Sequence, residues 1–173
     1  MPCFEAIKGV TESSDWQPLS PFWIQRNHHK FGQEEIIHQM KMHFKLPFKD
    51  EKGQVTPVQF DHFCFLSQCV QALVIKAQSE HYRRLKSSDA HCMGALYWQC
   101  NDIWQASLYF SRFNILQAPT WASIEYGGRW KVLHYFVKEF FSPVLVSSFE
   151  SADGRYEVHV TSDLVDAIQG NLR

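Results

Sequence analysis

The sequence lacks several features that would each assign it to a class of protein. It has no Asn-x-Ser/Thr sequon, no apolar run approaching the roughly 18 residues that span a bilayer, and no signal peptide at its N-terminus. Its basic residues are scattered and its formal net charge is −1, which argues against a nucleic-acid partner. We therefore expect neither a membrane nor a nucleic acid as partner, and a cytoplasmic location for the chain as written.

Recognisable disulfide and metal-binding spacings are also missing. The five cysteines form no CxxC pair, and we interpret them as small buried hydrophobic residues: Cys3, Cys64, Cys69, Cys92 and Cys100. Side chains that can bind a metal occur close together in three places: His28-His29, His38 with His43, and His62 with Cys64. Because His38 and His43 are five residues apart rather than four and no further ligand matches them, the sequence predicts no metal site and no cofactor.

The composition is that of a packed, globular chain. Of the 173 residues, 45% are hydrophobic and 15% are aromatic, which argues against disorder. A complete β/α barrel takes about 250 residues, so the chain is too short to be a whole barrel.

Hydrophobic spacing and turn residues predict the secondary structure. Residues 1–30 should be a loop-dominated segment that packs by its aromatic residues, anchored at Asp15-Trp16 and Phe22-Trp23. We expect a helix over 33–44 and a longer one after Thr56-Pro57 that ends in the basic turn 81–86. A further helix is expected over 127–141, and two short strands over 144–149 and 155–160, joined by a hairpin turn at Asp153-Gly154.

The most informative segment follows the long helix. Residues 93–97 are apolar and uncharged, which predicts a strand that is buried on both faces. Trp98, Gln99, Asn101 and Asp102 come at its carboxyl end, which is where a β/α barrel keeps its chemistry.

The run Gly-Ala-Leu-Tyr-Trp-Gln-x-Asn-Asp-Ile-Trp at 94–104 resembles the eighth barrel strand of β-mannosidases of glycoside hydrolase family two, especially the animal lysosomal enzymes. Residues 118–136 are similar to the loop and last barrel helix of that family, and the likeness extends upstream through 15–16, 26–29 and 43–47. The resemblance implies an α/β fold: the last helices and eighth strand of a (β/α)8 TIM barrel over 1–141, then the start of an immunoglobulin-like β-sandwich over 142–173.

The resemblance also implies a function. The parent would be a lysosomal, cofactor-free enzyme that hydrolyses terminal non-reducing β-D-mannose in glycoprotein oligosaccharides with retention. Trp98 would form the floor of the mannosyl subsite, where its flat ring stacks on the sugar, and Asn101 and Asp102 would be further substrate contacts. The alternatives are that Trp98 is a core residue and that Asn101 and Asp102 only bond to neighbouring loops. Trp104, Trp121 and Trp130 are interpreted as packing residues.

The two catalytic carboxylates of the family are absent. Retaining hydrolysis needs two carboxyl groups roughly 5 Å apart, which the family carries in an Asn-Glu pair and in a Ser-Glu-Tyr/Phe-Gly motif, and neither motif occurs in this chain. Asp102 or Glu125 would be the substitutes, but a single strand end cannot place groups on both sides of a sugar. Glu125 should instead cap or orient the start of the helix expected at Gly127. We therefore expect an N-terminally incomplete product without turnover.

Other readings of the chain stay open. It could act as a non-catalytic glycan- or protein-binding module, or regain activity on mixing with a separate N-terminal chain. Its unpaired strand edges favour aggregation or partial folding. Residues 106–117 look like an insertion, because Gln105-Ala106 recurs as Gln117-Ala118. This insertion is either a splicing or gene-model error or a loop that caps the pocket.

Overall fold

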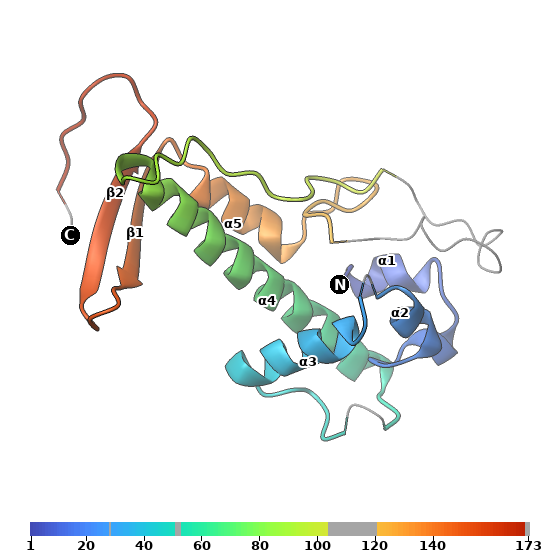
Figure 1. Cartoon of the computed structure of the whole chain (residues 1–173). Helices are drawn as coiled ribbons and strands as arrows, with labels where there is room; N and C mark the ends of the chain where they lie inside the picture. Colours follow the sequence, from blue (N-terminus) through green and yellow to red (C-terminus); the bar gives the residue numbers. More distant parts are fainter. Residues whose placement is uncertain (28, 51–52, 104–120, 172–173) are drawn as a thin grey trace. The chain divides into compact units, whose positions relative to one another are not determined.

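The computed structural model describes residues 1–27, 29–50, 53–103 and 121–171. The described chain forms two compact units (Figure 1): unit 1 comprises Met1–Val74 and Trp98–Tyr135, and unit 2 comprises Ile75–Tyr97 and Phe136–Arg173. Two helices, α4 (Pro57–Arg84) and α5 (Val132–Phe140), contribute residues to both units. The domain boundary expected between residues 141 and 142 falls inside unit 2 and stays a prediction.

Short helices gather at the start of α4 in unit 1 (Figure 1). They are α1 (Phe4–Lys8), the 3-10 turn η1 (Ser13–Asp15), α2 (Pro21–Gln25) and α3 (Gly32–His43). The expectation for 1–30 holds in that its aromatic residues pack: Trp23 is 4% exposed, and the rings of Phe4 and Trp16 meet edge to face with centroids 4.9 Å apart. The expected helix over 33–44 is confirmed as α3.

The start of α4 is fixed by a capping box, in which Thr56 is the N-cap that the sequence predicts. Thr56 Oγ1 accepts a hydrogen bond from the Gln59 amide nitrogen at 3.2 Å, and Gln59 Oε1 accepts one from the Thr56 amide nitrogen at 2.8 Å. Pro57 occupies the first helical position, where its missing N–H costs nothing. Phe60 and Phe63, both fully buried, then bring α4 onto α1, α2 and α3 in one hydrophobic core.

The segment Pro57–Ser87 is long and apolar enough to cross a membrane by length and composition alone. The expectation that no run of the sequence reaches that limit is therefore wrong. Helices from the cores of soluble proteins pass the same criterion, and the N-terminal half of α4 contributes Phe60, Phe63 and Cys64 to the core of unit 1. Packing within the protein therefore accounts for the apolar character of this half of the helix.

Unit 2 contains the predicted hairpin. The strands β1 (Val144–Glu150) and β2 (Tyr156–Ser162) pair antiparallel, with Val146 opposite Val160, and extend slightly further than predicted. Gly154 adopts a φ of 79° in the turn, as the Asp-Gly signal requires. The Arg84 side chain, near the end of α4, donates to Ser147 Oγ at 3.2 Å, which attaches the hairpin to the helix.

The strand predicted over 93–97 is not formed. Met93 and Leu96 are 93% and 98% exposed, and residues 93–97 are extended without regular structure. A strand buried on both faces needs a partner strand on each side, and the only sheet among the described residues is the β1–β2 pair. The structure thus supports a partial α/β arrangement with a two-stranded sheet.

The helix predicted over 127–141 begins later, at Val132. Gly127 and Gly128 both have a φ of 91°, which a right-handed helix excludes. Residues 124–130 instead form a tight turn, in which the Glu125 amide nitrogen donates to the Arg129 carbonyl oxygen at 2.8 Å and Ile124 forms a bridge with Trp130. The glycines therefore belong to a turn that leads into α5.

Candidate functional site

The segment that carries the predicted site residues, 98–102, is held in unit 1 by the segment 122–125. The Ser123 amide nitrogen donates to the Gln99 carbonyl oxygen at 3.0 Å, and the Ile124 amide nitrogen donates to the Cys100 carbonyl oxygen at 2.8 Å. The Asp102 amide nitrogen in turn donates to the Ile124 carbonyl oxygen at 2.9 Å. Although no regular strand forms, this ladder fixes the backbone on which Trp98 and Asn101 lie.

Ser123 is the centre of this arrangement. Its side chain is fully buried, and its hydroxyl donates to the Cys100 carbonyl oxygen at 2.7 Å. The same hydroxyl oxygen lies 3.0 Å from His134 Nδ1, while the Ser123 carbonyl oxygen accepts from the Lys131 amide nitrogen at 2.9 Å. One small residue thus connects the site segment to the start of α5.

The three predicted contact residues differ in their exposure to solvent. Trp98 is 74% exposed and Asn101 is exposed, whereas Asp102 is only 6% exposed. The Asn101 side-chain amide donates to the Asp102 carbonyl oxygen at 3.2 Å. Trp98 and Asn101 can therefore meet a ligand on the surface, and the burial of Asp102 favours the alternative in which it interacts with neighbouring segments.

Oppositely charged groups are buried behind the site. Asp102, Glu125 and Lys131 are 6%, 3% and 1% exposed. Burial lowers the pKa of Lys131, and the carboxylates of Asp102 and Glu125 oppose that shift. Burial likewise lowers the pKa of Arg26, again opposed by Asp102. The buried carboxylates and cations compensate one another, which is the condition under which charges are tolerated inside a protein.

Glu125 plays a different part from the one predicted. It does not cap a helix at Gly127, because the helix starts at Val132; its Oε1 accepts a hydrogen bond from the Cys3 amide nitrogen, and its Oε2 lies 3.9 Å from Arg129 Nε. Glu125 therefore joins the N-terminal segment to the turn before α5. Its burial, like that of Asp102, argues against a role as a substitute catalytic carboxylate.

The remaining sequence predictions have mixed outcomes. Trp121 and Trp130 are 36% and 44% exposed, and the Trp130 ring packs against the rings of His134 and Tyr135, as predicted for a packing residue. Cys64 is buried as predicted, whereas Cys100 is exposed. Among the described residues, no group of three or more His, Cys, Asp or Glu side chains is arranged to hold a metal ion. The predictions for His28, Trp104 and the segment 106–117 lie outside the described residues.

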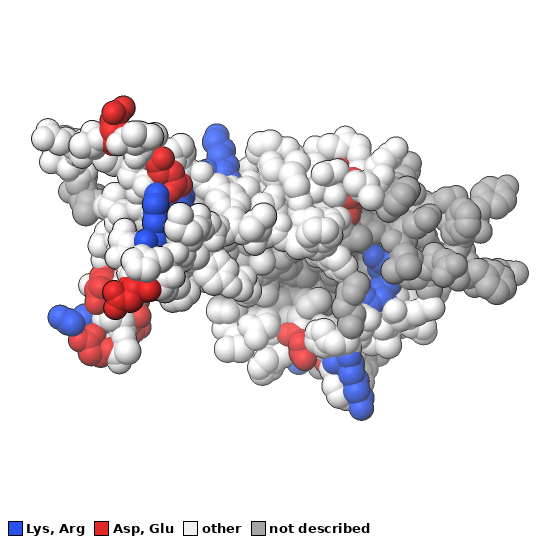
Figure 2. Space-filling view, turned by 45° about the horizontal axis from the view of Figure 1, so that its top comes forward, with Lys and Arg blue, Asp and Glu red and all other residues white. Residues whose placement is uncertain are grey.

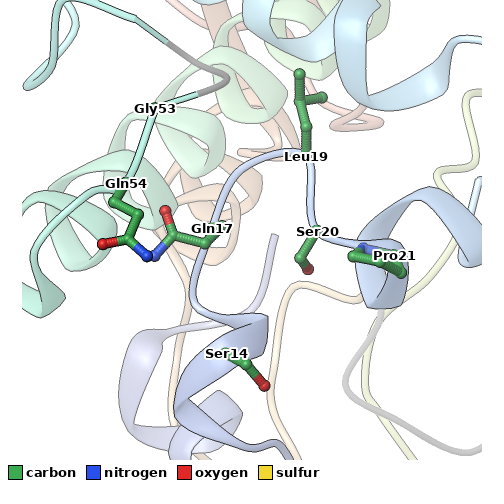
Figure 3. A pocket seen from close by; sticks show the side chains of 7 residues that line it. All are labelled: Ser14, Gln17, Leu19, Ser20, Pro21, Gly53 and Gln54. Atoms are coloured by element: carbon green, nitrogen blue, oxygen red, sulfur yellow. The ribbon is translucent and has the colours of Figure 1, made fainter.

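A separate pocket in unit 1, with a volume of about 370 Å³, contains none of the predicted site residues. Its lining side chains come from 14–21 and from Gly53-Gln54 (Figure 3). The Gln17 amide is committed to structure, because it accepts from the Val55 amide nitrogen at 2.8 Å and donates to the Val55 carbonyl oxygen at 3.3 Å. Lys and Arg side chains are scattered on the face shown in Figure 2, with no extended basic patch among the described residues of that face.

Ser123 and His134, which hold the site segment, were not predicted from the sequence. Neither belongs to a motif with a chemical meaning of its own, and their contact is made only when the turn at 124–130 folds back. The burial of Lys131 was not predictable either, since a lysine just before helix α5 is expected at the surface rather than in the interior.

Comparison with known proteins gives consistent relatives. The chain is 42% identical to mouse β-mannosidase over 167 residues, which is 94% of this chain and 17% of the mouse protein. It is 34% identical to β-mannosidase A of Aspergillus fumigatus over 187 residues, with 99% and 18% of the two chains covered. The crystal structure of the β-D-mannosidase from Dictyoglomus thermophilum matches with a TM-score of 0.69 at 28% identity, covering 95% of this chain and 17% of that one. No family model matches the chain.

These matches relate almost the whole chain to glycoside hydrolases. More specifically, the chain is homologous to one segment of the β-mannosidases, and it spans about one sixth of the length of the relatives that it matches. The family resemblance read from residues 94–104 is confirmed.

Proposed function

We propose that this chain supplies the wall of a mannosyl subsite in a β-mannosidase that removes terminal non-reducing β-D-mannose from oligosaccharides with retention. The observation that carries the proposal is the exposure of Trp98, 74% of the residue, at the end of a backbone segment that hydrogen bonds hold in place. An exposed indole on a fixed backbone is the kind of surface on which the C–H face of a sugar stacks.

Each predicted contact then has a distinct role. Trp98 provides the stacking surface, and the exposed Asn101 amide donates or accepts hydrogen bonds with sugar hydroxyls. Asp102 was predicted as a third contact; from its burial we propose that it acts by holding the segment through its interactions with Arg26 and Lys131. The reaction needs no cofactor and no metal, because carboxyl groups supply both the acid and the nucleophile.

The isolated 173-residue chain should have no turnover. Neither family motif with a catalytic glutamate occurs in it, and the two carboxylates considered as substitutes, Asp102 and Glu125, are buried. In this proposal residues 1–141 correspond to the end of a TIM barrel and residues 142–173 to the first strands of an immunoglobulin-like β-sandwich. The parent enzyme would act on glycoprotein oligosaccharides in the lysosome.

The test is a ligand titration that needs no catalysis. Methyl β-D-mannopyranoside should quench or shift the tryptophan fluorescence of the chain, and methyl β-D-glucopyranoside should do so more weakly. Trp98→Phe should lower the affinity by about tenfold through loss of indole stacking, while the matched control Trp121→Phe should not. Equal responses to both sugars, or an unchanged affinity in Trp98→Phe, would count against the subsite.

Activity can be tested by grafting the chain into mouse β-mannosidase in place of the homologous segment. The graft should hydrolyse p-nitrophenyl β-D-mannopyranoside, and Trp98→Ala within it should lower kcat/KM by about tenfold or more. The chain alone should release no p-nitrophenol. Release by the isolated chain would show that its own carboxylates suffice.

A second function is favoured by a different observation. Met93 and Leu96 in unit 2 expose almost their whole side chains, which is unusual for large apolar residues and typical of protein-binding surfaces. In this alternative the chain is a non-catalytic module that binds a protein through 93–97. Retention of a binding partner by wild-type chain but not by Leu96→Lys, without any response to mannoside, would favour it over the glycosidase segment.

A further inference from the structure

We infer that His134 and Ser123 form a pair of positioning residues for the mannosyl subsite, with His134 as a neutral Nδ1–H tautomer that donates to Ser123 Oγ. The inference rests on the proposed function only for its consequence at the sugar. The hydrogen-bonding pattern itself follows from the structure alone.

The direction of the bond follows from counting protons. The Ser123 hydroxyl has one proton, and at 2.7 Å it donates that proton to the Cys100 carbonyl oxygen, which can only accept. The same oxygen lies 3.0 Å from His134 Nδ1 and, with its proton already donated, can only accept a hydrogen bond there through a lone pair. Nδ1 must therefore carry the proton, so the neutral ring has its acceptor nitrogen at Nε2.

The pair is fixed from both sides. The Trp130 ring lies edge to face against the His134 ring at 4.3 Å between centroids, and the His134 amide nitrogen donates to the Lys131 carbonyl oxygen at 3.0 Å. Ser123 is fixed in turn by its backbone bonds to Gln99 and Lys131. The Cys100 carbonyl oxygen thus receives two donors, the Ser123 hydroxyl and the Ile124 amide, two residues after Trp98.

A simple packing role would not require these groups. Burying a hydroxyl costs free energy unless it is hydrogen bonded, so an apolar pair would fill the same space at lower cost. Here the two polar side chains satisfy each other and also the backbone of the site segment. The consequence is a defined position for Trp98 and Asn101, which a sugar would otherwise have to fix on binding.

The tautomer can be measured directly on the full chain. Long-range ¹H–¹⁵N correlation spectra recorded at about pH 8, above the usual histidine pKa of about 6.5, distinguish a protonated Nδ1 from a protonated Nε2. We expect His134 to show a protonated Nδ1 and an unprotonated Nε2. A protonated Nε2 would overturn the inference, whatever the chain binds.

Two variants separate positioning from packing. In His134→Asn the side-chain amide can donate from a place close to that of Nδ1, whereas in His134→Gln the longer side chain carries its donor beyond it. With 5-fluorotryptophan incorporated and the Trp98 resonance assigned from Trp98→Phe, His134→Asn should retain the wild-type ¹⁹F signal and His134→Gln should shift or broaden it. Equal signals in the two variants would overturn the inference, because packing alone does not distinguish the donors.

Sugar binding provides the last readout. The affinity for methyl β-D-mannopyranoside should fall about tenfold in His134→Gln and in Ser123→Ala, the effect of losing one buried hydrogen bond, and it should be largely kept in His134→Asn. If the wild-type chain binds no mannoside at all, the proposed function fails while the tautomer and ¹⁹F results still decide on the pair. Wild-type affinity in His134→Gln would overturn the positioning role.

Discussion

Arg83 at the end of α4 offers the clearest test of how unit 2 is held together. Its side chain is 6% exposed, and its guanidinium donates to the carbonyl oxygens of Phe140 at 2.7 Å and Ser142 at 2.6 Å, where α5 ends. A second nitrogen donates to Asp163 at 2.8 Å. One side chain therefore satisfies carbonyl groups that a helix end leaves without intrahelical partners, and it ties α4 to both α5 and the segment after β2.

The size of the effect can be worked from these contacts. Arg83→Met keeps the apolar stem but removes the donors, and hydrogen bonds to a charged group contribute about 1.5–3 kcal/mol each. The ion pair with Asp163, which is half exposed, adds at most about 1 kcal/mol. Since the two carbonyl bonds come from the same nitrogen, we take about 3 kcal/mol in all, which corresponds to about a hundredfold change in an opening equilibrium.

Hydrogen exchange of the β1–β2 amides measures this change without relying on tryptophan. All six tryptophans lie within the residue ranges of unit 1, so their fluorescence reports on that unit and should hardly respond. Arg83→Met should make the hairpin amides exchange about a hundredfold faster. The control Arg155→Met removes an arginine that is 76% exposed, and should change exchange by less than about threefold. Equal rates in the two variants would refute the reasoning.

Three further predictions concern buried groups and the exposed segment. Burial lowers the pKa of Lys131 below 10.5, so the unfolded chain binds a proton that the folded chain releases; stability should rise with pH between the lowered pKa and 10.5, and urea unfolding of Lys131→Met should lack that rise. Burial raises the pKa of Cys64 to about 12, so a thiol reagent at pH 8 should modify the exposed Cys100 at least tenfold faster, and equal rates would contradict the burial of Cys64. Leu96→Lys should lower self-association measured by light scattering, because Leu96 is an apolar residue that is 98% exposed. Unchanged scattering would show that self-association does not depend on Leu96.

The sequence predicted best those elements whose signals are local. The capping residues Thr56 and Gln59 and the Asp153-Gly154 turn fix their own backbone, and both the long helix and the hairpin formed where predicted. The start of α5 was misplaced because the helical pattern that begins at Trp130 was extended back over Gly127 and Gly128, although these paired glycines have positive φ values and form a turn. The prediction followed the helical spacing of the apolar residues, whereas in the structure the two glycines form a turn and the helix begins after it.

The sequence indicated candidate site residues, which stay a prediction, but it did not indicate their environment. Trp98 and Asn101 lie at the surface as a ligand contact requires, yet Asp102 is buried close enough to Arg26 and Lys131 for its charge to affect the pKa of both. Those two partners come from segments far away in the sequence, so no local pattern could reveal them. The same holds for Ser123 and His134, which meet only because the turn between them reverses the chain.

The segment 93–97 has the composition of a buried strand but is exposed and forms no strand in the structure. Its apolar residues are suited to a strand covered on both faces, and that prediction came from the residues themselves. Burial, however, depends on which segments pack around a residue, and a parallel strand forms its hydrogen bonds with strands that lie elsewhere in the sequence. The described residues supply no such neighbour, so Met93 and Leu96 remain exposed. Trp98 differs because its own backbone segment is held by 122–125, which is why the sugar contact can be proposed for a chain in which the predicted strand is absent.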